Sequence, residues 1–196
     1  MRRMILPALG VGCLIVTLSS MQAQVPEFGF PNIKRLGRAI VEFRDAQLQV
    51  VLNYEYSQRN HDSAWLLVDF GARSEKRLVL DREHFKLVSH SGEWFPVASQ
   101  RHFLDAAREI RSLRQNAAVW RHDLASYLGA LDRRESLKFF ALPGEGLVIA
   151  GALLDKDRNT FGELYFEMPR GGWESGEYAL LIEHPQASIK LPLSLD

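Results

Sequence analysis

Hydrophobic and polar residues alternate along several short segments of this chain. From Leu48 to Tyr56 every second residue is leucine, valine or tyrosine, with mostly polar residues between them. The same period of two recurs over 163–168 and 189–195. Successive side chains of a strand point to opposite faces, so this spacing predicts strands with one buried face. Pro192 has no backbone N–H to donate, which places the last strand at a sheet edge or at a local break.

Further short segments are predicted to be strands. They span 39–43, 64–70, 77–80, 85–90, 94–98, 137–141, 147–153 and 178–184. Ser91-Gly92 separates two of these strands at the spacing of a two-residue hairpin, and 155–159 is typical of a polar hairpin tip. Many short strands separated by turns favour an antiparallel sandwich or barrel over a parallel sheet.

One block interrupts the strands and carries helical spacing instead. Ser99 is a typical N-cap residue, and apolar residues then recur every three or four positions up to Ala117. After a short break, a second apolar series runs from Trp120 to Leu131. The interval 99–132 therefore predicts an inserted pair of amphipathic helices, each of which must bury its apolar stripe.

The first 24 residues have the organisation of a secretory signal peptide. Arg2 and Arg3 precede an apolar run of about 15 residues, and a short polar stretch closes the segment. The run is shorter than the roughly 20 residues that a membrane-spanning helix needs. We expect cleavage after Ala23, with an uncleaved N-terminal anchor as the alternative. The segment predicts a periplasmic or secreted protein that touches a membrane only if the anchor is kept.

The rest of the chain is predicted to be an extended lead-in over 25–37 and a single β-sandwich domain over 38–196. Cys13 is the one cysteine and lies within the N-terminal apolar run. We therefore expect no disulfide and no cysteine-ligated metal in the mature protein. The chain has no net formal charge, which argues against a nucleic-acid partner.

The last 35 residues resemble the closing strands of an immunoglobulin-like sandwich. They contain Gly162-Glu-Leu-Tyr-Phe-Glu-Met-Pro, Gly176-Glu-Tyr-Ala-Leu-Leu-Ile and Ile189-Lys-Leu-Pro-Leu. Tyr178 resembles the tyrosine corner of such folds. The whole is similar to immunoglobulin-like accessory domains of bacterial envelope proteins. This resemblance implies a mainly β, antiparallel sandwich and no catalytic residues, while the helical insert departs from the family's simple pattern.

Candidate metal ligands lack the spacing of known metal motifs. None of the six histidines lies in an HExxH pattern, although His84 and His90 would share a strand face and could meet His61 or His184. We interpret the histidines as solvated or capping residues. The histidines are His61, His84, His90, His102, His122 and His184.

A possible calcium loop is also incomplete. Asp155, Asp157 and Asn159 copy the first three ligand positions of an EF-hand. Thr160 stands where that loop needs glycine, and Phe166 stands where it needs glutamate. A solvated turn is the favoured interpretation, with a weak calcium site at Asp155 and Asp157 as the alternative.

Carboxylates for acid–base chemistry are present without a pattern that pairs them. Glu42, Asp69, Glu109 and Glu163 are the candidates, and the sequence offers no reason to join any two. No Gly-x-Ser-x-Gly nucleophile motif occurs. We therefore predict a non-enzymatic protein with no cofactor.

Arginines concentrate in the predicted helical insert. A solvated face of mixed charge is the ordinary interpretation of such a cluster. The alternative is a docking surface, because arginine pairs with carboxylates and is common at interfaces. The residues of this candidate surface are Arg101, Arg108, Arg111, Arg114 and Arg121.

Three functions are compatible with these sequence features. The favoured one is an exported interaction module that docks to an envelope or secretion-pathway protein through the sandwich and the arginine-rich insert. The alternative is a sandwich that binds a small ligand or carbohydrate, on which the rings of Trp173 and Trp94 would stack. Trp173 is a candidate because it lies in a glycine-rich loop and is expected to be exposed. Trp65 lies in an apolar strand and is assigned to the core. An envelope hydrolase is favoured least, since nothing supplies a nucleophile with a placed base.

Overall fold

The computed structural model describes residues 32–131, 133–168 and 171–196. The predicted signal peptide or anchor, Cys13 and most of the predicted lead-in lie outside these residues. The strands are β1 (Ile33–Arg35), β2 (Ile40–Arg44), β3 (Leu48–Asn53), β4 (Trp65–Ser74), β5 (Leu78–Asp81), β6 (Phe85–Ser89), β7 (Trp94–Pro96), β8 (Arg134–Leu137), β9 (Gly151–Leu154), β10 (Asn159–Glu167), β11 (Gly176–His184) and β12 (Ala187–Leu195). The helices are α1 (Glu55–Arg59), α2 (Gln100–Asp105), α3 (Ala107–Ala117) and α4 (Ala125–Leu128), with 3₁₀ turns η1 (Arg82–His84) and η2 (Ala118–Trp120).

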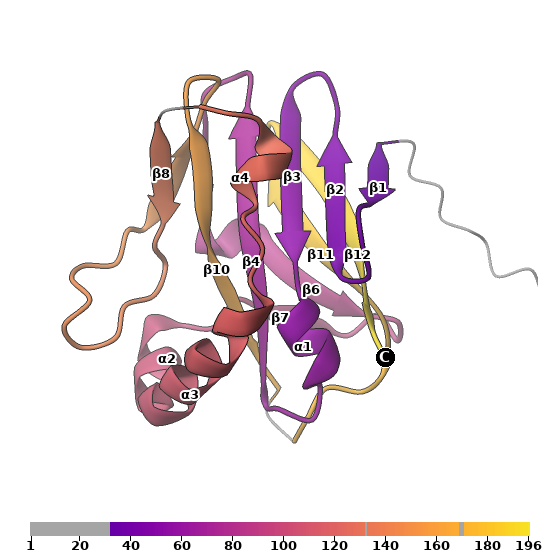
Figure 1. Cartoon of the computed structure of the whole chain (residues 1–196), viewed down its shortest axis with the longest axis vertical. Coiled ribbons are helices and arrows are strands. Elements are labelled where there is room, and N and C mark those ends of the chain that lie inside the picture. The colour runs from indigo at the N-terminus through magenta and orange to yellow at the C-terminus, as the bar shows by residue number, and fades with distance from the viewer. Residues whose placement is uncertain (1–31, 132, 169–170) are drawn as a thin grey trace, which may run out of the picture.

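Two sheets form the two layers of a mainly β fold (Figure 1). The front sheet has the order β1-β2-β3-β4-β10-β8, the back sheet has the order β12-β11-β6-β7, and β5 pairs with β9 beside them. The predicted antiparallel pairing is confirmed between the described strands, except that β8 runs parallel to β10. The chain passes through β9 between these two strands, and such a crossover allows a parallel pair.

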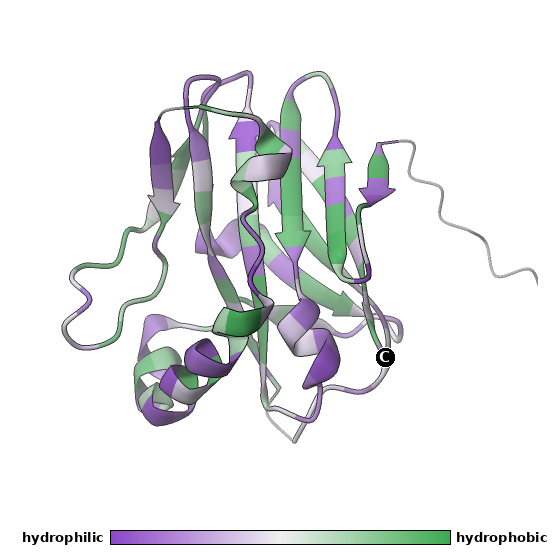
Figure 2. Cartoon of the chain, viewed as in Figure 1, coloured by the Kyte–Doolittle hydropathy of each residue, from purple (hydrophilic) through white to green (hydrophobic). Residues whose placement is uncertain are grey.

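Alternation along the strands places the core between the two sheets. Val50, Leu52 and Phe70 of the front sheet are fully buried, as are Phe85 and Leu180 of the back sheet. The rings of Phe70 and Phe85 meet edge to face across the layers, with 5.3 Å between their centroids. Figure 2 shows β3 as largely hydrophobic, whereas β8 at the sheet edge is hydrophilic.

Several local predictions are confirmed. Ser91-Gly92 lies in the turn between β6 and β7, and Gly92 has a φ of 85°, which glycine adopts without strain. The connection is longer than the predicted two-residue hairpin, because β6 ends at Ser89 and β7 begins at Trp94. β12, which contains Pro192, is an edge strand of the back sheet. Ser99 caps α2, since its Oγ accepts a hydrogen bond from the His102 N–H at 3.1 Å. Among the described residues, none of the helices is long and apolar enough to span a bilayer.

The predicted strand from Leu48 to Tyr56 is wrong at its end. The strand stops at Asn53, and α1 follows. Tyr54 is buried, and its hydroxyl accepts a hydrogen bond from the Ser194 N–H of the back layer at 3.2 Å. The alternation continues in the sequence past this point, but packing against the other layer ends the strand.

Two other predicted strands are displaced. The strand predicted at 137–141 is β8, which ends at Leu137, and the one predicted at 147–153 is β9, which begins at Gly151. Residues 143–150 are exposed and project from the body as a loop between these strands (Figure 1), which we call the projecting loop. Leu147 within it is 87% exposed. The prediction of a strand from Leu147 onward, which rested on the apolar residues alone, is therefore wrong for residues 147–150.

The helical insert is confirmed in its first half only. α2 and α3 follow one another with a break at Ala106, and the stripe residues Phe103, Ile110 and Ala117 are buried. The second predicted helix is reduced to η2 and the single turn of α4. Residues 118–131, here called the crossing segment, instead run over the outer face of the front sheet (Figure 1).

The crossing segment buries its apolar residues against that sheet face. Leu124 and Leu128 pack with Ile40 and Val51 in a second, smaller hydrophobic cluster. Gly71 of β4 makes room for this contact, because a Cβ there would lie 3.2 Å from Leu128 Cδ1. The insert thus covers part of the outer sheet face and leaves the rest open beside it.

Candidate functional site

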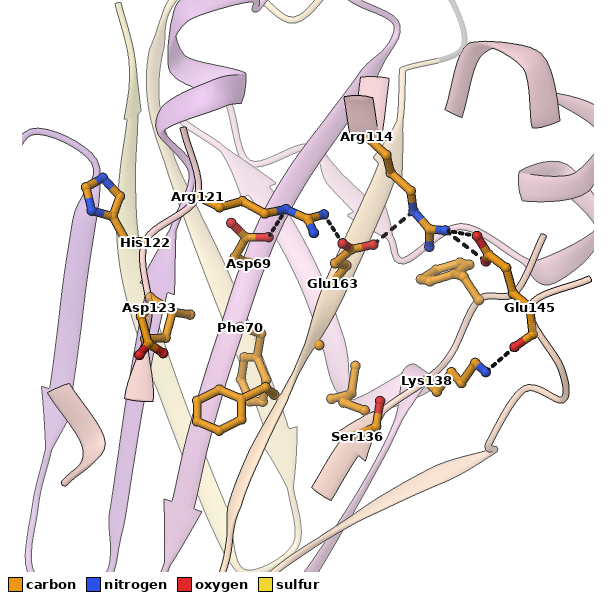
Figure 3. A pocket seen from close by; sticks show the side chains of 15 residues that line it. Asp69, Phe70, Arg114, Arg121, His122, Asp123, Ser136, Lys138, Glu145 and Glu163 are labelled. Carbon is orange, nitrogen blue, oxygen red and sulfur yellow. Dashed lines mark hydrogen bonds and ion pairs between the residues drawn. The ribbon is translucent and has the colours of Figure 1, made fainter. Parts of the chain in front are cut away.

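A pocket of about 570 Å³ opens on the outer face of the front sheet. β4 and β10 contribute its floor, and the crossing segment from Arg121 to Leu124 lines one side. β8, Lys138 after it and Glu145 of the projecting loop line the other side (Figure 3). The pocket therefore lies where the helical insert and the β8–β9 connection meet the sheet.

Two carboxylates lie side by side on the pocket floor. Asp69 of β4 and Glu163 of β10 are direct partners in the antiparallel register. Arg121 pairs with Glu163, and its Nε lies 3.9 Å from Asp69 Oδ1 (Figure 3). Asn53 also donates its side-chain N–H to Asp69 Oδ2 at 3.2 Å. Strand pairing thus brings together two acids that the sequence could not pair.

Asp69 titrates close to neutral pH. Burial raises its pKa from 3.8 to about 6, while the guanidinium of Arg121 opposes the rise and the charge of Glu163 adds to it. Desolvation dominates because a charged carboxylate loses hydration that a single cation at this distance does not replace.

Arg114 of α3 is held on the other side of Glu163. Its Nε lies 3.0 Å from Glu163 Oε2 and donates to the Tyr165 hydroxyl at 2.7 Å, and that hydroxyl donates to Glu163. Burial raises the pKa of Tyr165, so the phenol stays protonated. Burial would lower the pKa of Arg114, but Tyr165 and Glu163 outweigh it and keep the guanidinium charged.

Glu145 of the projecting loop completes the network. Both of its carboxylate oxygens lie 2.9 Å from Nη1 of Arg114, and Oε2 also accepts the Leu142 N–H at 2.8 Å. Lys138 donates to the backbone carbonyl of Glu145. Burial would raise the pKa of Glu145, yet the Leu142 N–H and Arg114 lower it overall. In this half of the pocket, Arg114 is therefore paired with two carboxylates, and Lys138 is held by a backbone carbonyl.

The predicted arginine surface divides into two groups. Arg114 and Arg121 turn into the pocket and hold its carboxylates. The other three are exposed on α2 and α3 and are not part of the pocket. These exposed residues are Arg101, Arg108 and Arg111.

The prediction for Trp173 requires a correction, because only 3% of it is exposed. Its ring packs against Phe95 and Tyr178, with centroid distances of 4.9 and 5.7 Å. The loop folds back so that the backbone N–H of Trp173 donates to the His61 carbonyl at 2.6 Å, and the indole enters the core. Trp94 is 61% exposed but lies outside the pocket, and Trp65 is buried as predicted.

Of the histidines that could meet, His84 and His184 lie together, with 4.8 Å between their ring centroids. His84 belongs to η1 and His90 follows β6, so these two do not share a strand. The Nδ1 atoms of His84 and His184 accept backbone N–H groups, from Asp81 at 2.9 Å and from Gln186 at 3.1 Å. Burial and the charge of His84 lower the pKa of His184. Across the described ranges, no group of three or more histidine, cysteine, aspartate or glutamate residues could hold a metal ion.

The candidate calcium loop is a turn in which the carboxylate of Asp155 is already bound by other groups of the chain. Asp155 Oδ1 accepts the Asp157 N–H at 3.0 Å, and Oδ2 lies 2.9 Å from Arg158 Nε. The favoured interpretation of this segment, a polar turn, agrees with these contacts.

The sequence did not identify Lys138 and Glu145 as pocket residues, nor Tyr165 as the residue that holds Arg114 and Glu163. A signal was present for the two floor acids, because each interrupts an otherwise apolar stretch of strand. Comparison of the chain with protein-family models, curated proteins and solved structures finds no match. The function must therefore be argued from the pocket itself.

Proposed function

We propose that this protein is an exported, non-enzymatic binding module whose pocket holds a small, hydroxyl-rich ligand such as a saccharide. The observation that carries this proposal is the pocket of about 570 Å³ with its paired charges. Its volume falls within the range of roughly 300–1,000 Å³ that is usual for small-molecule sites.

The paired charges favour a ligand that both donates and accepts hydrogen bonds. Asp69 and Glu163 present acceptors, and Arg121 presents donors. A hydroxyl group serves as donor and acceptor at once, so a polyol can join such a network. Phe161 lines the same pocket and offers a ring for the apolar face of a sugar.

The pocket residues also favour binding over catalysis. Ser136 is the one hydroxyl side chain among the residues that line the pocket, and no described histidine or carboxylate hydrogen-bonds to it. Glu163 is held by Arg114, Arg121 and the Tyr165 hydroxyl. A nucleophile activated by a free base, which covalent hydrolysis needs, is not assembled among these residues.

We propose further that the sandwich is immunoglobulin-like and belongs to the bacterial envelope. In support of the first point, the Tyr178 hydroxyl donates to the Glu174 carbonyl at 3.0 Å, as a tyrosine corner does. The second point rests on the N-terminal sequence of basic, apolar and polar parts.

A pair of arginine variants tests the function. Saccharides are titrated calorimetrically into the protein, into Arg121→Gln and into Arg111→Gln. We expect binding that Arg121→Gln weakens about tenfold, as the loss of a charged hydrogen bond would. Arg111→Gln removes an exposed arginine of the same insert and should leave affinity unchanged. Failure of every saccharide to bind, or equal loss in both variants, contradicts the proposal.

A second candidate function is docking to an envelope protein through the exposed arginines of α2 and α3. The observation in its favour is that Arg101, Arg108 and Arg111 all remain exposed. For this function, the same two variants should have effects opposite to those expected for saccharide binding. Arg111→Gln should weaken capture of a partner from envelope extracts, while Arg121→Gln should retain it.

A further inference from the structure

Glu145 occupies the pocket as a ligand would. Its carboxylate bridges to Nη1 of Arg114 through both oxygens, at 2.9 Å each. The residue belongs to the projecting loop and comes to the pocket from outside the sheet (Figure 3). A carboxylate bound to a fixed guanidinium is the arrangement by which proteins recognise external carboxylates.

We propose that the natural ligand is a sugar acid, whose carboxylate replaces the side chain of Glu145 on Arg114. This inference rests on the proposed function and narrows it from hydroxyl-rich ligands in general to those that carry one carboxylate. The acid group binds Arg114, and the hydroxyl groups reach the side of the pocket formed by Asp69 and Arg121.

Arg114 would keep its position after Glu145 leaves. Its Nε is held independently by the Tyr165 hydroxyl at 2.7 Å and by Glu163 at 3.0 Å. The guanidinium also lies over the ring of Phe103, 5.2 Å from the ring centroid. The receptor for a carboxylate is thus built from β10 and α2–α3, and the projecting loop is not needed to hold it.

The exchange is electrostatically balanced. One carboxylate leaves Arg114 and another takes its place, so the guanidinium is not left unpaired. An unpaired charge is the main cost of breaking a partly buried ion pair. The side chain of Glu145 is already 40% exposed and can move into solvent.

The projecting loop can release Glu145 at little cost in buried surface. Residues 143–150 are exposed throughout. Gly144 and Gly146 flank Glu145 with φ angles of 94° and 87°. The described hydrogen bonds that hold this loop include those of Glu145 with Leu142, Lys138 and Arg114. Segments with few buried contacts open most readily, so the loop is suited to this exchange.

The test replaces Glu145 by glutamine, which removes the charge of the competing carboxylate and keeps the size and shape of the side chain. Glucuronate, glucose and succinate are titrated into the full chain, Glu145→Gln and Glu135→Gln. Glu135 is the matched control, because it forms an ion pair with Arg158, in the turn before β10, and does not line the pocket. We expect Glu145→Gln to bind glucuronate about tenfold more tightly, since the internal competitor is gone. Glucose affinity should stay the same, and Glu135→Gln should behave like the wild type.

Arg114→Lys in the Glu145→Gln background provides a second readout. Lysine keeps the charge but cannot hold Tyr165 and Glu163 through one nitrogen while presenting another to the ligand, so the gain for glucuronate should disappear. Thermal unfolding of each variant checks that the fold is retained. If Glu145→Gln itself unfolds, Glu145→Ala with the same three probes replaces it.

The outcomes separate this inference from the proposed function. Unchanged glucuronate affinity in Glu145→Gln, with glucose bound by the wild type, overturns the carboxylate proposal and keeps the function. Tighter succinate binding in Glu145→Gln, with no binding of either sugar, keeps the carboxylate site and overturns the sugar ligand. An equal gain for glucose and glucuronate, or no binding of any probe, overturns the inference.

Discussion

Asp69 shows how folding changes a single residue. In the sequence it is an acid within an apolar segment, and in the structure it lies beside Glu163 with its carboxyl largely buried. Its pKa is about 6, above the 3.8 of an exposed aspartate. The folded state therefore binds a proton on Asp69 more readily than the unfolded state does. Ionisation of Asp69 at neutral pH lowers the free energy of unfolding.

The variant Asp69→Asn tests this cost. We expect it to raise the free energy of unfolding at pH 7 by about 3 kcal/mol, because the buried charge is removed. The sign of the linkage requires the difference from wild type to shrink as pH falls below 6, where Asp69 becomes protonated in the folded protein. Urea denaturation at pH 5, 6, 7 and 8 measures it, and a difference that stays constant over this range would contradict the assignment.

The crossing segment shows what packing decides at the scale of an element. Its apolar series at steps of three and four predicted a continuous helix, yet only the 3₁₀ turn η2 and the single turn of α4 are helical. The stripe is buried as predicted, because Leu124 and Leu128 still reach Ile40 and Val51. Contact with a flat sheet satisfies the same apolar residues without a continuous helix, since tertiary packing outweighs helix propensity.

Close contact between the crossing segment and β4 depends on Gly71. A Cβ at this position would lie 3.2 Å from both Leu128 and the ring of Phe161. We expect Gly71→Ala to lower the free energy of unfolding by about 1 kcal/mol through overpacking, as measured by urea denaturation. Gly37→Ala is the control, since a Cβ there meets nothing within 4 Å. Equal effects of the two substitutions would show that this packing is not tight.

At the scale of the whole molecule, Tyr54 links the two layers. It follows β3 of the front sheet, and its hydroxyl accepts the Ser194 N–H of β12 in the back sheet at 3.2 Å. Burial raises the pKa of this phenol despite that hydrogen bond, which agrees with its interior position.

We expect Tyr54→Phe to lower the free energy of unfolding by about 1 kcal/mol, because the Ser194 N–H loses its acceptor. Tyr56→Phe removes a hydroxyl of the next tyrosine in the chain and serves as the control. Thermal and urea unfolding of both variants measure the difference. A Tyr54→Phe protein as stable as Tyr56→Phe would mean that water replaces the link between the layers.

Much of the fold was predictable, because its determinants are local. Period-two alternation identifies β3, β10 and β12, and Ser99 marks the start of α2. The predictions failed where a residue's partner is distant in the chain. Trp173 lies in a glycine-rich loop that is typical of exposure, but its indole fills a space between Phe95 and Tyr178.

By itself, the sequence determined the mainly β character, the helical insert with its buried stripe, and the lack of recognisable catalytic motifs. The tertiary structure alone decided which charges meet. Asp69 and Glu163 become neighbours through the pairing of β4 with β10, and Arg114 reaches both Glu163 and Glu145 from the insert. The physical reason is that hydrophobic periodicity is read from adjacent residues, whereas the partner of a charge depends on strand order, register and the path of the insert across the sheet.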